Sequence, residues 1–228
     1  MATQPGKAKT NPLKEFAKKI AFRHTNLFRP KYPYSIEPIQ LSKIIASIDE
    51  VLADKDGKGC IVEIGVARGK TSRFIVEHII KSGYDVDYYC IDTFSSFTDD
   101  DLQYEVENRG KRMVELQGFA YNDFETWKKN FKEFGFVKPI QADASAFDFS
   151  TIAPIDFCFL DVDLYIPTRN VMTSISEHMS QHSILMCDDV RDEGSWDGAY
   201  QAFMEHVRER DLAYEIFGTK CGFIRFPQ

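Results

Sequence analysis

The chain has 228 residues, the size of a single α/β domain with an N-terminal extension. Its 35 Asp and Glu residues outnumber its 28 Lys and Arg residues, and the net charge of −7 argues against binding to nucleic acid or to anionic membranes. Five cysteines lie far apart without a CxxC pair, so we expect reduced core thiols in a cytoplasmic protein rather than a zinc site or a disulfide framework. No apolar run reaches the length of a membrane span.

Residues 1–38 are predicted to form a tail and an extension ahead of the main domain. Residues 1–12 are polar and contain two prolines, which is typical of a flexible tail. From Leu13 onward, apolar residues recur at the i, i+3, i+4, i+7 spacing of a helix, with lysines on the other face. We expect this helix to dock either on the main domain or on a partner subunit of a homo-oligomer.

Residues 39–228 are predicted to form one doubly wound α/β domain. Apolar runs rich in β-branched residues predict strands at 60–66, 85–92, 137–143, 156–162 and 183–190. Helices are predicted at 39–52, 70–81, 122–134, within 167–182, and at 196–210. Strands that alternate with helices imply a mainly parallel sheet. Two closing strands, 214–219 and 222–226, have only two residues between them and should form an antiparallel hairpin, which makes a single seven-stranded sheet.

Residues 95–120 interrupt this alternation. They are irregular in pattern and acidic at their start, where Asp99, Asp100 and Asp101 follow one another. We interpret them as an insertion that lies over the ligand site as a lid.

The stretch CIVEIGVARGKTS, Cys60 to Ser72, is predicted to be a strand, a glycine turn and a helix start. Gly65 permits a sharp turn after the strand, and Gly69 permits close approach of the backbone to a ligand. Glu63 is a carboxylate at the end of a buried strand, so it needs a partner, which a cationic ligand would supply. The GxxxG spacing is not the GxGxxG that favours dinucleotides, and by itself it is equally compatible with a structural turn.

Acidic residues end each of the first five predicted strands, where ligands bind in such sheets. A carboxylate at Asp92 can accept both hydroxyls of a ribose, and Asp143 follows a strand from which it can approach an adenine edge. Each Asp singly could instead cap a loop or helix. Taken together, the acidic strand ends favour a nucleoside ligand.

Asp161, Asp188 and Asp189 form a second acidic group. Carboxylates that converge from adjacent strand ends repel one another unless a cation lies between them. Oxygen ligands without His or Cys favour Mg²⁺, Ca²⁺ or Mn²⁺ over zinc. Asp163 is expected to point to the opposite face of the strand. The alternative is that these acids cap the following helices and bind water.

Five segments together resemble class I S-adenosylmethionine-dependent methyltransferases: VEIGVARGKTS, YYCIDTF, FLDVDLYIPT, CDDV and WDGAYQAF. The resemblance covers about residues 35–227 and is specifically to the macrocin O-methyltransferase family, which methylates sugar hydroxyls on natural products. FLDVDLY followed by CDDV is its most specific part. A Rossmann-like methyltransferase fold is implied.

The resemblance also implies roles for individual residues. Around the methionine moiety of S-adenosylmethionine it places Glu63, Gly65, Gly69 and Thr71. It places Asp92 at the ribose, and Asp143, Ala144 and Ser145 beside the adenine. Mg²⁺ would be held by Asp161, Asp188 and Asp189.

The proton acceptor is left open by the sequence. The catechol O-methyltransferase group is a more distant likeness, and where it has a catalytic lysine this chain has Leu164. A carboxylate, Asp161 or Asp163, or a histidine would take the proton instead. We therefore expect a Mg²⁺-dependent O-methyltransferase for a hydroxylated small molecule, a sugar or another natural product. The alternatives are a metal-independent methyltransferase and a non-catalytic protein that binds a nucleoside cofactor.

Overall fold

The computed structural model describes residues 11–227. Contacts within the chain divide it into two units, one ending at Pro33 and the other starting at Tyr34, ahead of the boundary at residue 39 expected from the sequence. The first unit contains α1 (Pro12–His24), the helix predicted from the apolar spacing. Asn11 caps it by accepting a hydrogen bond from the backbone N–H of Leu13 at 3.0 Å. The predicted tail falls mostly on residues 1–10, outside the described part of the chain.

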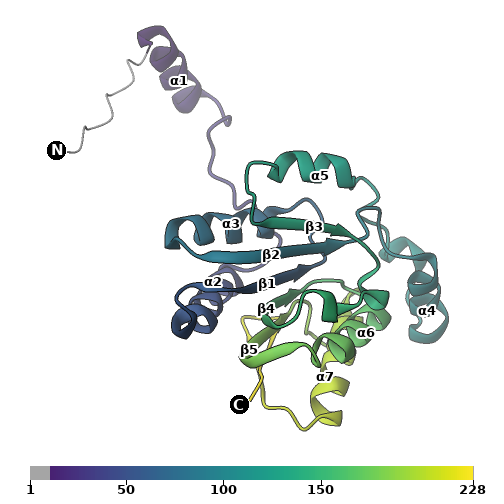
Figure 1. The fold of residues 1–228 in the computed structure, drawn as a ribbon. Coiled ribbons are helices and arrows are strands. Elements are labelled where there is room, and N and C mark those ends of the chain that lie inside the picture. The colour runs from purple at the N-terminus through teal and green to yellow at the C-terminus, as the bar shows by residue number, and fades with distance from the viewer. Residues whose placement is uncertain (1–10, 228) are drawn as a thin grey trace. The chain divides into compact units, whose positions relative to one another are not determined.

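The second unit is built around a seven-stranded sheet with the order β3-β2-β1-β4-β5-β7-β6 (Figure 1). Five strands run parallel: β1 (Lys58–Ile64), β2 (Asp85–Asp92), β3 (Val137–Gln141), β4 (Ile155–Leu160) and β5 (Met179–Cys187). β6 (Tyr214–Phe217) and β7 (Cys221–Arg225) form an antiparallel hairpin, and β7 also pairs antiparallel with β5. The predicted fold, a mainly parallel doubly wound sheet with a C-terminal hairpin, is confirmed.

Helices cover both faces of this sheet and create two cores. On one face lie α2 (Pro38–Leu52), α3 (Lys70–Ser82) and α5 (Phe124–Phe131). The other face carries α6 (Tyr165–Ile175) and α7 (Asp197–Glu209), seen on the opposite side of the sheet from α5 in Figure 1. Successive residues of a strand point to opposite faces, so Ile61 joins the first core and Val62 the second. Within residues 11–227, no helix has both the length and the apolar character needed to cross a membrane.

Two helices differ from the prediction. α5 spans only 124–131, and it begins at Phe124 because Asp123 accepts a hydrogen bond from the backbone N–H of Thr126 at 2.8 Å and so caps the helix at that point. A further helix, α4 (Asp99–Arg109), lies in the segment predicted to be irregular. Thr98 caps its start and Gly110 ends it in the left-handed conformation. Its acidic first turn suits the positive end of the helix dipole, but it has almost no apolar periodicity by which it could be recognised.

Candidate active site

A cavity of about 460 Å³ lies at the carboxyl ends of the parallel strands. In the sheet, β2 and β3 lie on one side of β1, and β4 and β5 lie on the other side. The cavity lies at this topological switch point, where ligands bind in sheets of this kind. Many of the predicted site residues line it: Gly65, Asp92, Asp143, Ala144, Asp161, Asp163, Asp188 and Asp189. The remaining four, Glu63, Gly69, Thr71 and Ser145, lie outside the described lining.

Gly65 and Asp92 together shape the turn after β1. Gly65 has a φ of +84°, and a Cβ there would lie 1.8 Å from the carbonyl oxygen of Asp161, so only glycine allows this close approach. Asp92 Oδ2 accepts hydrogen bonds from the backbone N–H groups of Val66 and Ala67 at 2.9 and 3.0 Å. Its Oδ1 accepts one from Phe94 at 2.6 Å. Asp92 therefore holds the glycine turn in place, and Oδ1 retains the capacity to accept a further hydrogen bond from a ligand.

Packing inside the protein requires a glycine at position 69. Its φ is +74°, and a Cβ there would lie 2.7 Å from the ring of Phe131 and 2.9 Å from Trp127 Nε1. These two rings stack on each other with centroids 4.0 Å apart. Gly69 thus makes room for the packing of α5 against the start of α3. The expectation that its backbone also approaches a ligand stays a prediction.

Glu63 finds its partner inside the protein. Its side chain is 1% exposed and accepts a hydrogen bond from the hydroxyl of Tyr88. Burial raises the pKa of Glu63 to about 7, although the hydrogen bond from Tyr88 opposes the shift. The partner that sequence reasoning assigned to a cationic ligand is a tyrosine of β2.

Asp143 and Ser145 lie in the loop after β3. Asp143 lines the cavity and accepts a hydrogen bond from the backbone N–H of Ser145 at 2.9 Å, so it caps a short 3₁₀ turn as well. Ser145 Oγ is buried and has no hydrogen-bond partner among the described residues. A buried hydroxyl without a partner is costly. Thr71 lies in the first turn of α3.

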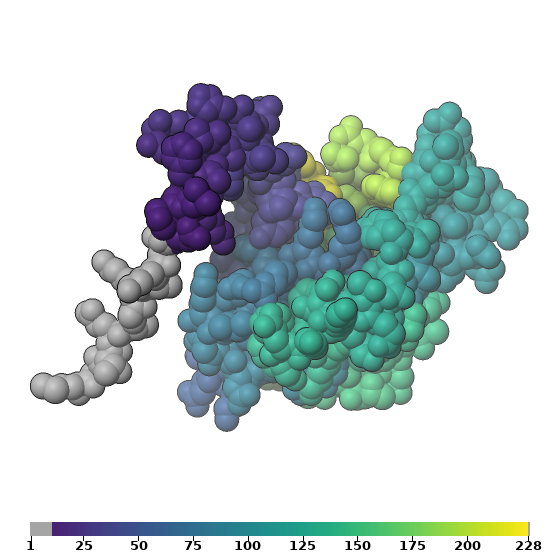
Figure 2. All heavy atoms as spheres, turned by 90° about the horizontal axis from the view of Figure 1, so that it is seen from above, coloured from purple at the N-terminus to yellow at the C-terminus, as the bar shows by residue number. Residues whose placement is uncertain are grey.

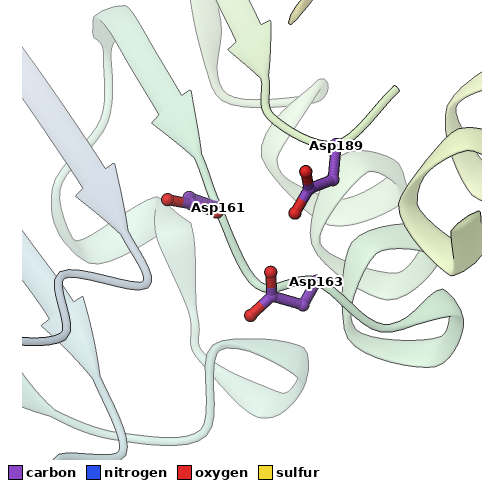
Figure 3. A group of neighbouring side chains, drawn as sticks. All are labelled: Asp161, Asp163 and Asp189. Carbon is purple, nitrogen blue, oxygen red and sulfur yellow. The ribbon is translucent and has the colours of Figure 1, made fainter. Parts of the chain in front are cut away.

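At the other end of the cavity, one carboxylate oxygen each from Asp161, Asp163 and Asp189 lie within 4.8 Å of one another. Figure 3 shows the carboxylates of Asp163 and Asp189 facing each other across the gap between the ends of β4 and β5. Burial, and then repulsion by the neighbouring carboxylates, raises the pKa of Asp161 and of Asp163 well above the usual range. Such a set of hard oxygen donors fits Mg²⁺, which would relieve the repulsion.

The three carboxylates that converge are not the three predicted. Asp163 was expected to point away because strand residues alternate, but β4 ends at Leu160 and Asp163 has a φ of +63°, so that alternation does not apply. Asp188 was predicted to be a metal ligand. Its Oδ1 accepts a hydrogen bond from Gln40 Nε2 at 2.6 Å and its Oδ2 one from Lys220 Nζ at 2.9 Å, so both oxygens already have partners.

Lys220 is the site residue that sequence reasoning missed. It lies in the turn between β6 and β7, and its ammonium group also donates to Asp189 Oδ1 at 2.7 Å. Burial disfavours its charge, but the attraction of Asp188 and Asp189 raises the pKa of Lys220 above its usual value. A lysine in a hairpin turn is ordinary in a sequence. Only the pairing of β7 with β5 brings this one to the acidic strand ends.

The 95–120 segment forms part of the cavity wall through Ser96, Phe97, Thr98, Asp101 and Phe119. It is anchored from α4, where the buried Glu105 accepts a hydrogen bond from the backbone N–H of Tyr165 at 2.7 Å, at the start of α6. Arg109 forms an ion pair with Asp197 at 2.7 Å. Figure 2 shows the teal atoms of this segment beside the light green atoms that precede and begin α7. The segment borders the cavity, and its role as a lid over the site stays a prediction.

None of the five histidines, all of which belong to the described residues, lines the cavity. His206 is a buried residue of α7, and its Nε2 lies 3.1 Å from Oγ of Ser176 at the end of α6. The titratable groups of the cavity wall are therefore carboxylates together with Lys220 and Arg191. If a group of the described cavity wall accepts a proton, the crowded carboxylates are the best placed.

Comparisons with known proteins agree with this architecture. A family model described as a methyltransferase domain matches residues 62–190. The O-methyltransferase NovP is 16% identical with a TM-score of 0.65, over 83% of this chain and 80% of that one. The calicheamicin methyltransferase CalS11 is 16% identical with a TM-score of 0.65, over 100% of both chains. An rRNA methylase from Streptococcus thermophilus is 14% identical with a TM-score of 0.51, over 86% of this chain and 99% of that one.

At these identities the structural matches show the fold alone. They confirm the Rossmann-like methyltransferase fold, and their names show that it serves acceptors as different as a natural product and an RNA. A search of curated protein sequences finds no match.

Proposed function

Because the chain belongs to the family of methyltransferase domains, we propose that it transfers the methyl group of S-adenosylmethionine to a hydroxyl group of a small molecule. The observation that carries this proposal is the two-ended cavity. One end is formed by the loops after β1, β2 and β3, and the other by crowded carboxylates after β4 and β5. A nucleoside cofactor and a hydroxylated acceptor would then lie side by side in one cavity.

The cofactor end offers polar groups that suit the nucleoside. Asp92 Oδ1 has one backbone partner and can accept from the ribose hydroxyls. Asp143 and Ala144 line the wall where the adenine would lie, and the unpartnered Ser145 Oγ is close behind them. Gly65 and Ala67, in the turn after β1, would face the methionine moiety. Glu63, Gly69 and Thr71, which the resemblance places around the same moiety, lie outside the described lining of the cavity.

The acidic end offers three carboxylates to a divalent cation, Asp161, Asp163 and Asp189. Bound S-adenosylmethionine would supply an electrophilic methyl group, and bound Mg²⁺ would lower the pKa of an acceptor hydroxyl. The carboxylates would orient the acceptor oxygen, and whichever of Asp161 and Asp163 has an oxygen left free by the cation would receive its proton as the C–O bond forms and the methyl–sulfur bond breaks, which leaves S-adenosylhomocysteine. Phe97 and Trp196, with ring centroids 5.6 Å apart, add apolar surface to the cavity wall, which would limit the access of water.

The chemistry of the wall favours a small, hydroxyl-bearing acceptor over RNA. The chain carries a net charge of −7, and the cavity end that would receive the acceptor is itself acidic. The structurally similar CalS11 is named a TDP-rhamnose 3′-O-methyltransferase, which supports a sugar hydroxyl as the acceptor here. A methyltransferase that works without a metal is the second candidate, because Lys220 already neutralises part of the acidic end.

Calorimetry with S-adenosylhomocysteine, with NAD⁺ as the matched control, tests the cofactor class directly. We expect one saturable site for S-adenosylhomocysteine and no heat with NAD⁺. Transfer of radiolabelled methyl groups to a panel of glycosides, before and after exhaustive chelation, then separates the two candidates. Full transfer after chelation would reject the metal-dependent mechanism, and the absence of S-adenosylhomocysteine binding would reject the methyltransferase assignment.

A further inference from the structure

The ammonium group of Lys220 lies against two carboxylates at the acidic end of the cavity. It lies 2.9 Å from Asp188 Oδ2 and 2.7 Å from Asp189 Oδ1, and its side chain is only 17% exposed. A lysine on a protein surface has many rotamers open to it, whereas this one is held by two charged hydrogen bonds in a partly dry site.

The backbone around Lys220 is held on both sides, so the position of the ammonium is set by the fold. The carbonyl oxygen of Lys220 accepts a hydrogen bond from the backbone N–H of Val190 at 2.7 Å, next to the acidic pair. Thr219 donates its backbone N–H and its hydroxyl to the carboxylate of Glu37, each at 2.9 Å. The hairpin turn is thereby fixed both to the end of β5 and to the start of α2.

The partners of Lys220 explain why the open carboxylates differ from those implied by the sequence. Asp188 has one oxygen bonded to Gln40 and the other to Lys220, so neither is free of a partner. Asp189 gives one oxygen to Lys220, and it is still one of the three residues whose carboxylates converge. Asp161 and Asp163 complete that group.

We propose that Lys220 is a resident counter-cation that competes with a divalent metal for the acidic end of the cavity and weakens metal binding. This inference rests on the proposed metal site. A unit positive charge fixed a few ångströms from a divalent ion repels it strongly in a partly buried site. Removing that charge should increase metal affinity, because the repulsion is lost. It also removes two hydrogen bonds that orient the carboxylates, and we expect this second effect to be the smaller one.

The test is the affinity of the full chain for Mn²⁺ alone, measured by electron paramagnetic resonance of the free ion. Lys220→Met keeps an unbranched side chain that is one atom shorter and removes its charge, and we expect it to bind Mn²⁺ roughly tenfold more tightly or better. Lys220→Arg keeps the charge and should bind no more tightly than the unmodified chain. Lys55→Met is the matched control, because Lys55 pairs with the buried Asp156 at the opposite, amino end of the strands; its affinity should not change.

Binding of Mn²⁺ by Lys220→Met alone would also support the proposal. Unchanged or weaker binding by Lys220→Met would overturn it, as would the absence of binding in every variant. S-adenosylhomocysteine binding is measured on the same samples. Its persistence would show that the failure concerns Lys220 and the metal, and leaves the cofactor assignment standing.

Discussion

Burial of His206 should make the stability of this protein depend on pH. The side chain is 4% exposed, and burial, followed by the repulsion of Arg210, lowers its pKa from 6.5 to about 4. A histidine whose folded-state pKa is depressed contributes stability that is present above pH 6.5 and is lost as the pH falls toward 4. Between these values the unfolded chain binds a proton that the folded chain rejects.

The magnitude follows from the two pKa values. Lowering the pH from 7.5 to 5 should reduce the free energy of unfolding by about 2 kcal/mol through this one residue, approaching about 3 kcal/mol below pH 4. The carboxyl groups with raised pKa values, such as Asp161 and Asp163, act in the opposite direction, because the folded chain takes up their protons more readily than the unfolded chain. The total pH dependence therefore cannot isolate His206.

A variant without a titratable group at position 206 isolates the contribution of His206 to the pH dependence of stability. His206→Gln retains a polar side chain near Ser176 but takes up no proton. Between pH 7.5 and 5, the unfolding free energy of the unmodified chain should therefore fall by about 2 kcal/mol relative to that of the variant. Urea unfolding followed by circular dichroism at several pH values measures this difference, and the contributions of all other groups cancel. A difference that stays constant over this pH range would refute the argument.

Three further predictions concern the site and the extension. Asp92→Asn should weaken S-adenosylhomocysteine binding by about 1.5–3 kcal/mol, because a charged acceptor is lost; calorimetry on a variant with unchanged circular dichroism measures this, and equal affinity would contradict the ribose assignment. Asp163→Asn should reduce the rate of methyl transfer by about 100-fold or more, while its affinity for S-adenosylhomocysteine stays within about twofold of that of the unmodified chain. Asp192→Asn, at an exposed position, is the control and should keep both the transfer rate and the affinity. Deletion of residues 1–33 should change the oligomeric state or the activity, because α1 has no buried residue and exposes Leu13 and Phe16; light scattering and a transfer assay check this, and a truncated chain that keeps both properties would show that the extension is only a tail.

The fold was predictable because its signals are local and repeated. Each buried strand is a short apolar run, and each covering helix has an apolar stripe that can be read without knowing its partner. The region Asp85–Asp92 was predicted to the residue. α4 was not predicted because it lacks this local signal: Glu105 is its only buried residue, and it has no apolar stripe.

At the acidic end of the cavity, the sequence predicts the composition of the site but not its geometry. That carboxylates gather there follows from the sequence, because parallel strands end at one edge and Asp161, Asp188 and Asp189 follow adjacent strands. Which of them converge depends on where β4 stops, and the left-handed conformation of Asp163 turns its side chain toward Asp189. The pattern of apolar residues does not predict a strand end to within two residues. That difference nevertheless decides that Asp163, and not Asp188, joins the converging carboxylates.

The sequence by itself determined the order of strands and helices, the glycine turn and the acidity of the strand ends, since these depend on residues close together in the chain. Only the tertiary structure decided that Tyr88 partners Glu63, that Gly69 makes room for Phe131, and that Lys220 meets Asp188 and Asp189. These pairs are separated by 25 to more than 60 residues or lie on different strands, and their contact follows from sheet order and helix packing. Such contacts carry no periodic signal, because their geometry exists only once the sheet has formed.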